Sequence, residues 1–426
     1  MKYPIATFIA FFLMNTAVVQ CEDWPAFRGA SGDGVSHETD VPVEWSTDQN
    51  IRWKAILPQP GNGSPIVCGG LVFLACAEDT KGHRRSLICF DRETGERKWV
   101  KTVEFQKEMP THKTNLYCGS TPVTGGERVV VWHSSAGLYC YDFVGREIWS
   151  RDLGEFEHMW GYGSSPVVHD GRVFINCGPG KSNFVTGIDL ATGDTVWETE
   201  EPFQGDGDHN EDGKYMGSWS TPIIVNVDGD DQVICVLPTR INGYDPASGS
   251  ILWTCDGIRG LKGDLAYSSP VVSGDLCVTV GGFNGPAIGL RLGGEGDITA
   301  TNRLWRTEPN PQSVGSGVFV DEHFYRSNAD RPSIVQCVDP LTGEVLWSGP
   351  PGGSSWSSIV SAGGNLYLTD QDGVTLVFKP NPHEFELVSK NELNEPSNST
   401  LAVSRRQIFL RTAKHLFCIA ELHAGE

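Results

Sequence analysis

An all-β fold, an eight-bladed β-propeller of four-stranded antiparallel blades, is predicted by three features of this sequence. A turn motif of the form Asp-x-x-Thr/Ser-Gly-x-x-x-Trp recurs along most of the chain. Eight segments rich in Ser, Thr and Pro mark the starts of successive units, and such a repeat is typical of propellers and solenoids. Gly 50 and Pro 25 among 426 residues suit short strands joined by tight turns, and no convincing helical periodicity follows the N-terminal segment.

The clearest copy of the turn motif runs from Asp189 to Trp197. Thr192 and Gly193 form the turn, because glycine adopts positive φ at little cost and the Asp189 carboxylate can accept hydrogen bonds from the turn backbone. Val196 and Trp197 then begin a strand, where β-branched and aromatic side chains are favoured. Copies with the same spacing lie at 91–99, 245–253 and 339–347, a shorter copy lies at 142–149, and a copy with an insertion lies at 291–305.

The units can be counted from their starts. Clear starts lie at 64–65, 120–122, 164–166, 220–222 and 268–270, and weaker ones at 315–317, 357–359 and 399–401. In the seventh unit Phe385 is expected in the place of the tryptophan. The eighth unit, 399–422, has only three strands, so we expect the isolated strand that ends in Trp53 to supply the fourth and to close the ring without an open sheet edge.

The N-terminus predicts export. Lys2 precedes a short apolar run from Ile5 to Met14, which is too short to span a bilayer and suits a secretory signal. We therefore expect a signal peptide at 1–20, a Gly-rich lead-in at 21–49 and the propeller at 50–426, in a periplasmic or secreted protein. Membrane association is expected only through an uncleaved signal or a lipidated Cys21, and Gln20 occupies a position where a lipidation signal needs a small residue.

The formal net charge of −20 argues against two classes of partner. Binding to nucleic acid or to an anionic membrane surface requires Lys and Arg to neutralise phosphates. We expect neither kind of binding.

The chain has 12 cysteines, and four of them share one position of the repeat, two residues before the Asp of the turn motif or its equivalent. These are Cys89, Cys140, Cys337 and Cys418, and other units have Gly or Val there. Stacked sheets lie about 10 Å apart, which is beyond the reach of a disulfide. We expect buried, unbonded thiols that pack against the next sheet. No Cys-x-x-Cys is present, so no zinc knuckle or c-type haem site is encoded.

With its recurrent turn motif, the sequence resembles the pyrroloquinoline-quinone (PQQ)-type β-propeller superfamily from about Trp24 onward. The superfamily contains quinoprotein dehydrogenases and also non-catalytic propellers of the outer-membrane assembly lipoprotein kind. The lead-in sequence Trp-Pro-x-Phe-Arg-Gly resembles planctomycete-type PQQ-like repeat proteins. The resemblance to the dehydrogenases implies a vicinal disulfide, but no adjacent cysteines occur here. The calcium ligands and the catalytic Asp of the dehydrogenases could not be mapped onto this chain.

Candidate binding residues follow from propeller geometry. Inter-blade loops share a face with the loops between second and third strands, and the Thr-Gly turns lie on the other face. Three residues before the Pro of each start, or its equivalent, the chain reads Asn62, Gly119, Gly163, Trp219, Tyr267, Val314, Trp356 and Asn398. We expect Trp219, Tyr267 and Trp356 at the channel mouth, either as a platform for a flat ligand or a sugar, or as packing between blades.

Loops on the same face also carry cations, including Arg240 and Arg331. Convergent guanidinium groups suit a polycarboxylate, a phosphate or an acidic peptide, and solvated loops are the alternative. The acidic segments 206–213 and 228–231 lack EF-hand spacing, so we interpret them as solvated loops and assign no metal ligand. No catalytic residue is assigned either.

The function expected from the sequence is that of an exported, non-catalytic binding or scaffold protein for a protein partner or a small anionic ligand. Its cofactor-site or ligand-site candidates are Trp219, Tyr267, Trp356, Arg240 and Arg331. A PQQ- and calcium-dependent quinoprotein dehydrogenase is the first alternative, and a carbohydrate-binding propeller is the second. No cofactor is assured, and PQQ with calcium is the one that the resemblance raises.

Overall fold

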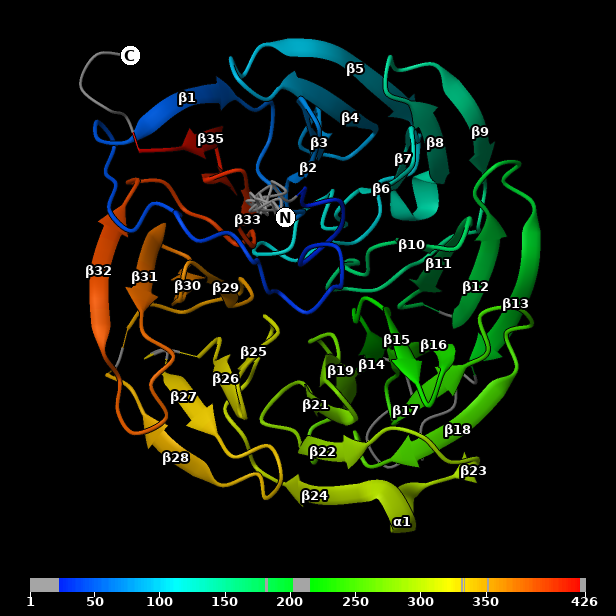
Figure 1. Cartoon of the computed structure of the whole chain (residues 1–426). Coiled ribbons are helices and arrows are strands. Elements are labelled where there is room, and N and C mark those ends of the chain that lie inside the picture. Colours follow the sequence, from blue (N-terminus) through cyan, green and yellow to red (C-terminus); the bar gives the residue numbers. More distant parts are fainter. Residues whose placement is uncertain are drawn as a thin grey trace, which may run out of the picture.

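The computed structural model describes residues 23–180, 183–201, 215–330, 332, 334–350 and 352–421. The expected signal peptide, Cys21, the acidic segment 206–213 and Arg331 lie outside these residues. Eight four-stranded antiparallel sheets are arranged around one axis as the blades of a propeller (Figure 1), so the predicted fold is confirmed. In the described part of the chain, no helix is long and apolar enough to cross a bilayer.

The first four blades follow the chain, each from its inner to its outer strand. Blade 1 has β2 (Ile66–Cys68), β3 (Leu71–Ala77), β4 (Arg84–Asp91) and β5 (Arg97–Glu104); blade 2 has β6 (Val123–Gly125), β7 (Arg128–Trp132), β8 (Leu138–Asp142) and β9 (Glu147–Arg151); blade 3 has β10 (Val167–His169), β11 (Arg172–Cys177), β12 (Asn183–Asp189) and β13 (Thr195–Glu201); blade 4 has β15 (Ile223–Val227), β16 (Asp230–Val236), β17 (Arg240–Tyr244) and β18 (Ile251–Asp256).

The remaining blades complete the ring. Blade 5 has β20 (Val271–Ser273), β21 (Leu276–Val280), β22 (Ala287–Arg291) and β24 (Arg303–Thr307); blade 6 has β25 (Val318–Val320), β26 (His323–Ser327), β27 (Val335–Val338) and β28 (Val345–Ser348); blade 7 has β29 (Val360–Ala362), β30 (Asn365–Thr369), β31 (Val374–Phe378) and β32 (Leu387–Glu392); blade 8 has β33 (Ala402–Ser404), β34 (Gln407–Arg411), β35 (His415–Ile419) and β1 (Ile51–Ile56). Smaller elements are the parallel pair β14 (Met216–Ser218) and β19 (Asp264–Ala266), the added strand β23 (Gly296–Asp297), α1 (Thr299–Asn302) and the 3-10 turn η1 (Ser134–Ala136).

The blades pack face to face, and their sequences reflect this. The second strand β3 is buried from Val72 to Ala77 and is a continuous apolar run, as expected for a strand that is covered on both faces. The outer strand β5 alternates between exposed and partly buried residues. The core therefore lies between the inner strands of neighbouring blades.

The turn-motif tryptophans connect neighbouring blades. Trp197 Nε1 in blade 3 donates a hydrogen bond of 2.9 Å to the carbonyl of Pro246 in the turn of blade 4. Gly249 in that turn has φ +72°, and a Cβ added there would lie 2.4 Å from the Trp197 ring. Glycine is therefore needed both for its backbone conformation and for close contact. The glycines of the equivalent turns, Gly95, Gly145, Gly193 and Gly343, pack in the same way on Trp53, Trp99, Trp149 and Trp305.

Trp253 is the exception, and the insertion in blade 5 explains it. The turn that would receive its indole is replaced by β23 and α1, and β23 pairs with β18 in parallel. Trp253 Nε1 instead donates to Oε1 of Gln232 in its own blade at 2.8 Å.

The repeated cysteines are buried and free, as predicted: Cys89, Cys140, Cys337 and Cys418. Their position lies directly across from the turn-motif tryptophan of the same blade, as in the pairs Cys89–Trp99 and Cys418–Trp53. At Gly243, which takes this position in blade 4, an added Cβ would lie 2.3 Å from the Trp253 indole. The size of the side chain at this repeat position is thus limited by the tryptophan of the same blade as well as by the neighbouring sheet.

The expectation for Phe385 was wrong. Ser389, not Phe385, lies opposite Val377 in blade 7. Phe385 precedes β32 and packs on Phe378 and Trp347, with ring centroids 5.3 and 6.0 Å away. Blade 7 therefore has no tryptophan in this place.

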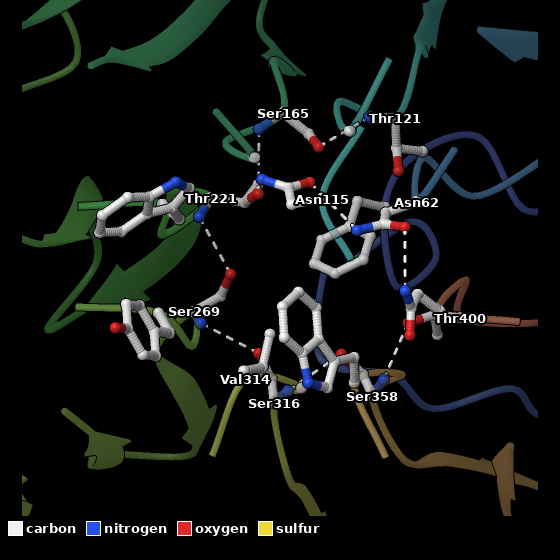
Figure 2. A pocket seen from close by; sticks show the side chains of 18 of the residues that line it. Asn62, Asn115, Thr121, Ser165, Thr221, Ser269, Val314, Ser316, Ser358 and Thr400 are labelled. Carbon is white, nitrogen blue, oxygen red and sulfur yellow. Dashed lines mark hydrogen bonds between the residues drawn. The ribbon is translucent and has the colours of Figure 1, made fainter. Parts of the chain in front are cut away.

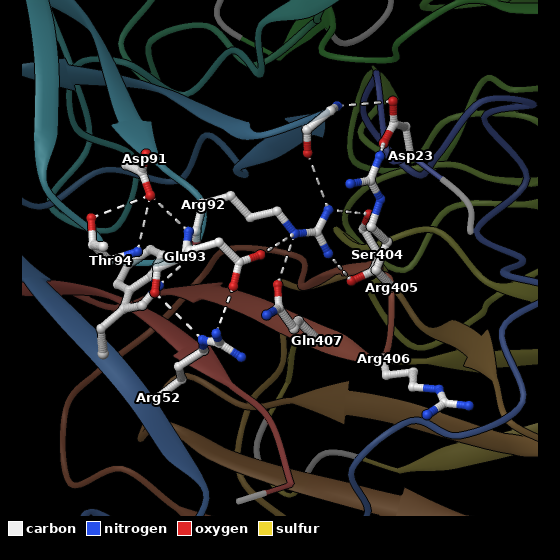
Figure 3. Close-up of polar contacts among 12 residues, drawn as sticks. Asp23, Arg52, Asp91, Arg92, Glu93, Thr94, Ser404, Arg405, Arg406 and Gln407 are labelled. Carbon is white, nitrogen blue, oxygen red and sulfur yellow. Dashed lines mark hydrogen bonds and ion pairs between the residues drawn. The ribbon is translucent and has the colours of Figure 1, made fainter. Parts of the chain in front are cut away.

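The ring closes as the sequence predicts, because β1 pairs with β35 and Trp53 lies opposite Cys418. Figure 3 shows the polar contacts along this junction of blades 8 and 1. Buried Arg92 of blade 1 donates to Oε1 of Gln407 and to Oγ of Ser404, both at 2.9 Å. The ends of a chain of several hundred residues are thereby joined through backbone and side-chain bonds.

The lead-in crosses the centre of the ring on the face of the Thr-Gly turns (Figure 1). Trp24 exchanges two backbone hydrogen bonds with Val67 in blade 1. Arg28, buried, donates to five backbone carbonyls, among them those of Ser316 and Ile359 in blades 6 and 7. The segment therefore spans the ring and covers one end of its central channel.

Candidate functional site

A cavity of about 340 Å³ lies in the central channel, between the lead-in and the opposite mouth. Its size falls at the lower end of the range for small-molecule sites, about 300–1,000 Å³. All eight positions that lie three residues before the blade starts line it: Asn62, Gly119, Gly163, Trp219, Tyr267, Val314, Trp356 and Asn398. Phe27 of the lead-in also lines the cavity, so the channel is closed at that end.

A closed belt of hydrogen bonds surrounds the channel next to these residues, and Figure 2 shows the part of it that runs from Thr121 to Thr400. In each blade the backbone N–H of one Ser or Thr donates to the hydroxyl of its counterpart in the next blade. The bonds are Ser64 to Thr121 (2.9 Å), Thr121 to Ser165 (2.9 Å), Ser165 to Thr221 (3.1 Å), Thr221 to Ser269 (3.0 Å), Ser269 to Ser316 (3.0 Å), Ser316 to Ser358 (3.0 Å), Ser358 to Thr400 (2.9 Å) and Thr400 to Ser64 (3.1 Å). We call these eight residues the hydroxyl belt.

The belt explains the Ser/Thr-Pro sequences at the blade starts. The belt residue directly precedes proline in the first five blades, and proline has no N–H that would need a partner in the channel. Each belt hydroxyl is used as an acceptor and retains its own O–H. Seven of the eight residues, all except Ser64, line the cavity. The belt therefore presents a ring of hydroxyl donors to a ligand.

An aromatic wall, made of Trp160, Trp219, Tyr267 and Phe283, forms one side of the cavity. Ring centroids are 5.9 Å apart between Trp160 and Trp219, and 5.2 Å between Trp160 and Phe283. Trp219 is fixed in orientation because its Nε1 donates to the carbonyl of Gly161 at 2.9 Å. Burial raises the pKa of Tyr267, so its hydroxyl stays protonated and can donate.

An amide chain, made of Gln371, Asn398, Asn62 and Asn115, runs along another side, where its three asparagines line the cavity. Nε2 of Gln371 donates to Oδ1 of Asn398 at 2.8 Å, Nδ2 of Asn398 to Oδ1 of Asn62 at 3.3 Å, and Nδ2 of Asn62 to Oδ1 of Asn115 at 3.0 Å. The remaining amide protons of the three asparagines donate to backbone carbonyls, including those of Thr114 and Trp160. Each asparagine oxygen keeps a lone pair, so this side offers fixed acceptors.

The cavity is uncharged over the residues that the structure describes. Its lining there includes no Lys, Arg, Asp or Glu, and His112 is its one histidine. Among the described residues no group of three or more His, Cys, Asp or Glu could hold a metal ion.

The structure places the candidate residues in different surroundings. Trp219, Tyr267 and Trp356 line the cavity together, whereas Arg240 does not. Arg240 begins β17, where its Nη2 lies 2.5 Å from Oε2 of Glu201. Glu201 is buried, which raises its pKa, and Arg240 and the Tyr244 hydroxyl are its partners. The expectation that Arg240 faces the channel mouth was wrong, because its guanidinium is engaged by this carboxylate.

Sequence reasoning missed several lining residues: Phe27, His112, Asn115, Phe283 and Gln312. They lie in loops of differing length that share no repeat position. The hydroxyl belt had a visible signal, the recurrent Ser/Thr before Pro, but its pairing across blades required the ring.

Comparisons with known proteins agree on the fold. A family model described as outer membrane protein assembly factor BamB matches residues 111–349. The structure of BamB from Moraxella catarrhalis is similar, with a TM-score of 0.60 and 15% identity over 87% of this chain and 99% of that chain. A quinohemoprotein alcohol dehydrogenase from Comamonas testosteroni has a TM-score of 0.68 and 12% identity over 95% and 82%.

A europium-containing methanol dehydrogenase has a TM-score of 0.54 and 11% identity over 92% of this chain and 90% of that chain. The comparison with curated proteins returned no match. At these identities the likeness to solved structures shows the fold alone.

Proposed function

The chain belongs to the family of PQQ-like repeat β-propellers whose model is described as outer membrane protein assembly factor BamB, and on this premise we propose that it is an exported, non-catalytic binding protein. Its ligand would sit in the channel-mouth cavity. The observation that carries the proposal is the composition of that cavity, in which aromatic faces, fixed amide acceptors and hydroxyl donors meet without a charged catalytic group in the described lining.

Solved structures with this fold include, by their names, both BamB and a quinohemoprotein alcohol dehydrogenase, so the fold cannot decide between binding and oxidation. The choice has to come from the site. Export is supported by the apolar run at 5–14 and by the outer-membrane assembly role printed for the family.

The described residues do not fit PQQ with calcium. PQQ is a flat tricarboxylate, and it would need cations opposite its carboxylates as well as an aromatic face. The described lining has the aromatic faces but no Arg or Lys. The described cysteines are all free, so no vicinal disulfide lies beside the cavity, and the described chain offers no carboxylate cluster for calcium.

The same argument bears on the expected anionic ligand. Arg240 is paired with Glu201, and the net charge of −20 opposes the approach of an anion. The cavity is better suited to an uncharged ligand, free or displayed on a protein partner that docks on the inter-blade loops. Binding of an anion would require a lysine or arginine in the lining that is not already paired with a carboxylate.

A titration with PQQ, with and without Ca²⁺, tests this proposal, followed by dye-reduction assays with short alcohols and sugars. We expect no calcium-dependent tight binding and no substrate oxidation. Tight calcium-dependent binding with turnover, abolished in Trp356→Ala and retained in Trp347→Ala, would refute the proposal. Trp347 is a matched control because it lies on the outer strand β28, outside the cavity lining.

A further inference from the structure

Resting on the proposed binding function, we infer that the ligand is a neutral saccharide and that the cavity holds the end of its chain. Three properties of the cavity lead to this inference: one broad aromatic side, an opposing polar side whose hydrogen-bonding groups are held in place, and a closed floor.

The aromatic wall gives a flat apolar surface. A pyranose ring has one face of C–H groups and a rim of hydroxyls, so it can pack on an indole or a phenyl ring while its rim remains available for hydrogen bonds. Trp356, which comes from the start of blade 7, lines the cavity and makes no ring contact with the wall. It can therefore offer a second face to the same ligand.

The polar groups match hydroxyls, which both donate and accept. The oxygens of Asn62, Asn115 and Asn398 are acceptors, and rotating any of these amides would break the bonds of the amide chain. The hydroxyl belt and the Tyr267 hydroxyl supply donors. Because the acceptors are held before the ligand arrives, little side-chain entropy is lost on binding.

Binding of charged ligands is disfavoured, for anions by the lack of a partner charge and for cations by the arrangement of the rings. A uronic acid would bring a carboxylate into a cavity whose described lining contains no cation, and burying an unpaired charge is costly. A quaternary ammonium ion is the strongest rival, since aromatic cages bind it. The four rings of the wall, however, contact one another, with centroids 5.2–6.3 Å apart, so they form one surface without room for a cation between them.

The lead-in sets the length of chain that can enter. Phe27 lines the cavity, and the neighbouring Arg28 anchors the segment to blades 6 and 7 through buried bonds to Ser316 and Ile359. Because this end is closed, a polysaccharide cannot thread through the channel. The end of a polysaccharide chain or a short linear oligosaccharide can enter from the mouth, whereas a cyclic oligosaccharide, which has no chain end, cannot.

The test is a titration by calorimetry and tryptophan fluorescence with defined probes. The neutral probes are glucose, galactose, N-acetylglucosamine, maltose and cellobiose. The probes that we expect not to bind are galacturonate, choline and α-cyclodextrin, which is a cyclic relative of maltose without a chain end. We expect saturation by at least one neutral saccharide, with none of the three excluded probes competing for the site.

Variants then locate the site. Trp356→Ala should lower the affinity for the saccharide by about tenfold or more, and Trp356→Phe should recover part of this affinity because a ring face remains. Asn398→Ala should weaken it as well, through the lost acceptor. Trp347→Ala should leave the affinity unchanged, and thermal melting of each variant shows that the ring is folded.

Saturation by choline in the absence of any saccharide would overturn the inference and leave the proposed binding function standing. An affinity for α-cyclodextrin equal to that for maltose would overturn the chain-end geometry. Calcium-dependent PQQ binding with turnover would instead refute the proposed function itself. A failure of all neutral saccharides to saturate the protein would also overturn the inference.

Discussion

Thr400 of the last blade donates its backbone N–H to Oγ of Ser64 in the first blade at 3.1 Å, although 336 positions separate them. This bond completes the hydroxyl belt that surrounds the channel. The belt couples each blade to the next at the depth of the cavity, so seven of its eight residues both stabilise the ring and line the cavity.

Removing one belt hydroxyl should destabilise the whole propeller. In Ser64→Ala the buried N–H of Thr400 loses its acceptor, and we expect the free energy of unfolding to fall by about 1–3 kcal/mol. Urea unfolding measures this loss. Ser64→Thr is the matched control, because other blades carry Thr in the belt and the hydroxyl is kept; an equal loss in both variants would contradict the account.

The turn glycines should be sensitive to contact as well as to backbone strain. Gly249→Ala combines φ +72° with a Cβ 2.4 Å from the Trp197 ring, whereas Gly171→Ala has φ +70° and no neighbouring atom within 4 Å. Both variants are destabilised by the left-handed backbone conformation. We expect the free energy of unfolding to fall by about 1–3 kcal/mol more in Gly249→Ala, through overpacking. Equal unfolding free energies for the two variants would show that the tryptophan contact is unimportant.

The features of the fold and of the cavity that could be predicted from the sequence are those that lie within one repeat. The turn motif is local in sequence, since Asp189, Gly193 and Trp197 lie within one hairpin, and it predicted the blades. The recurrent blade starts predicted their number and the closing strand. The repeat also indicated that the residues three positions before each start share a face, and Trp219 and Trp356 do line one cavity.

What the sequence could not predict depends on partners from other segments. Arg240 was expected at the channel mouth, but its direction is set by Glu201, which comes from the preceding blade. Phe27 reaches the cavity only because the lead-in crosses the ring, and the amide chain joins Asn398 to Asn62 across the ring junction. These contacts have no counterpart in a single repeat.

The thiols should be unreactive until the protein unfolds. Eleven cysteines are free among the described residues, and Cys68 alone of these is partly exposed. Burial raises the pKa of Cys89, Cys140 and Cys418 to about 12, so little thiolate forms at neutral pH. We expect a thiol reagent to modify Cys68 first in the native protein and at least eleven thiols after denaturation without reductant. A smaller count in the denatured protein would reveal disulfides.

Acid should weaken the turns. Hydrogen bonding by the backbone N–H of Thr192 lowers the pKa of Asp189, and that of Arg146 does the same for Asp142. Because the folded pKa is below the unfolded value of about 3.9, this stabilisation is present above that pH and is lost as the pH falls through the folded pKa. Urea midpoints measured down to about pH 3 should fall, and less steeply for Asp189→Asn. A midpoint that is independent of pH in this range would contradict the assignment.

The most direct test of the central claim is 19F NMR of protein labelled with 5-fluorotryptophan, with resonances assigned by Trp→Phe variants among the 13 tryptophans. On saturation with the best neutral saccharide, the account predicts shifts for Trp356, Trp160 and Trp219. The turn-motif tryptophans, such as Trp99 and Trp347, should keep their resonances. Shifts confined to the turn-motif tryptophans, or shifts of the cavity tryptophans caused only by PQQ with Ca²⁺, would contradict it.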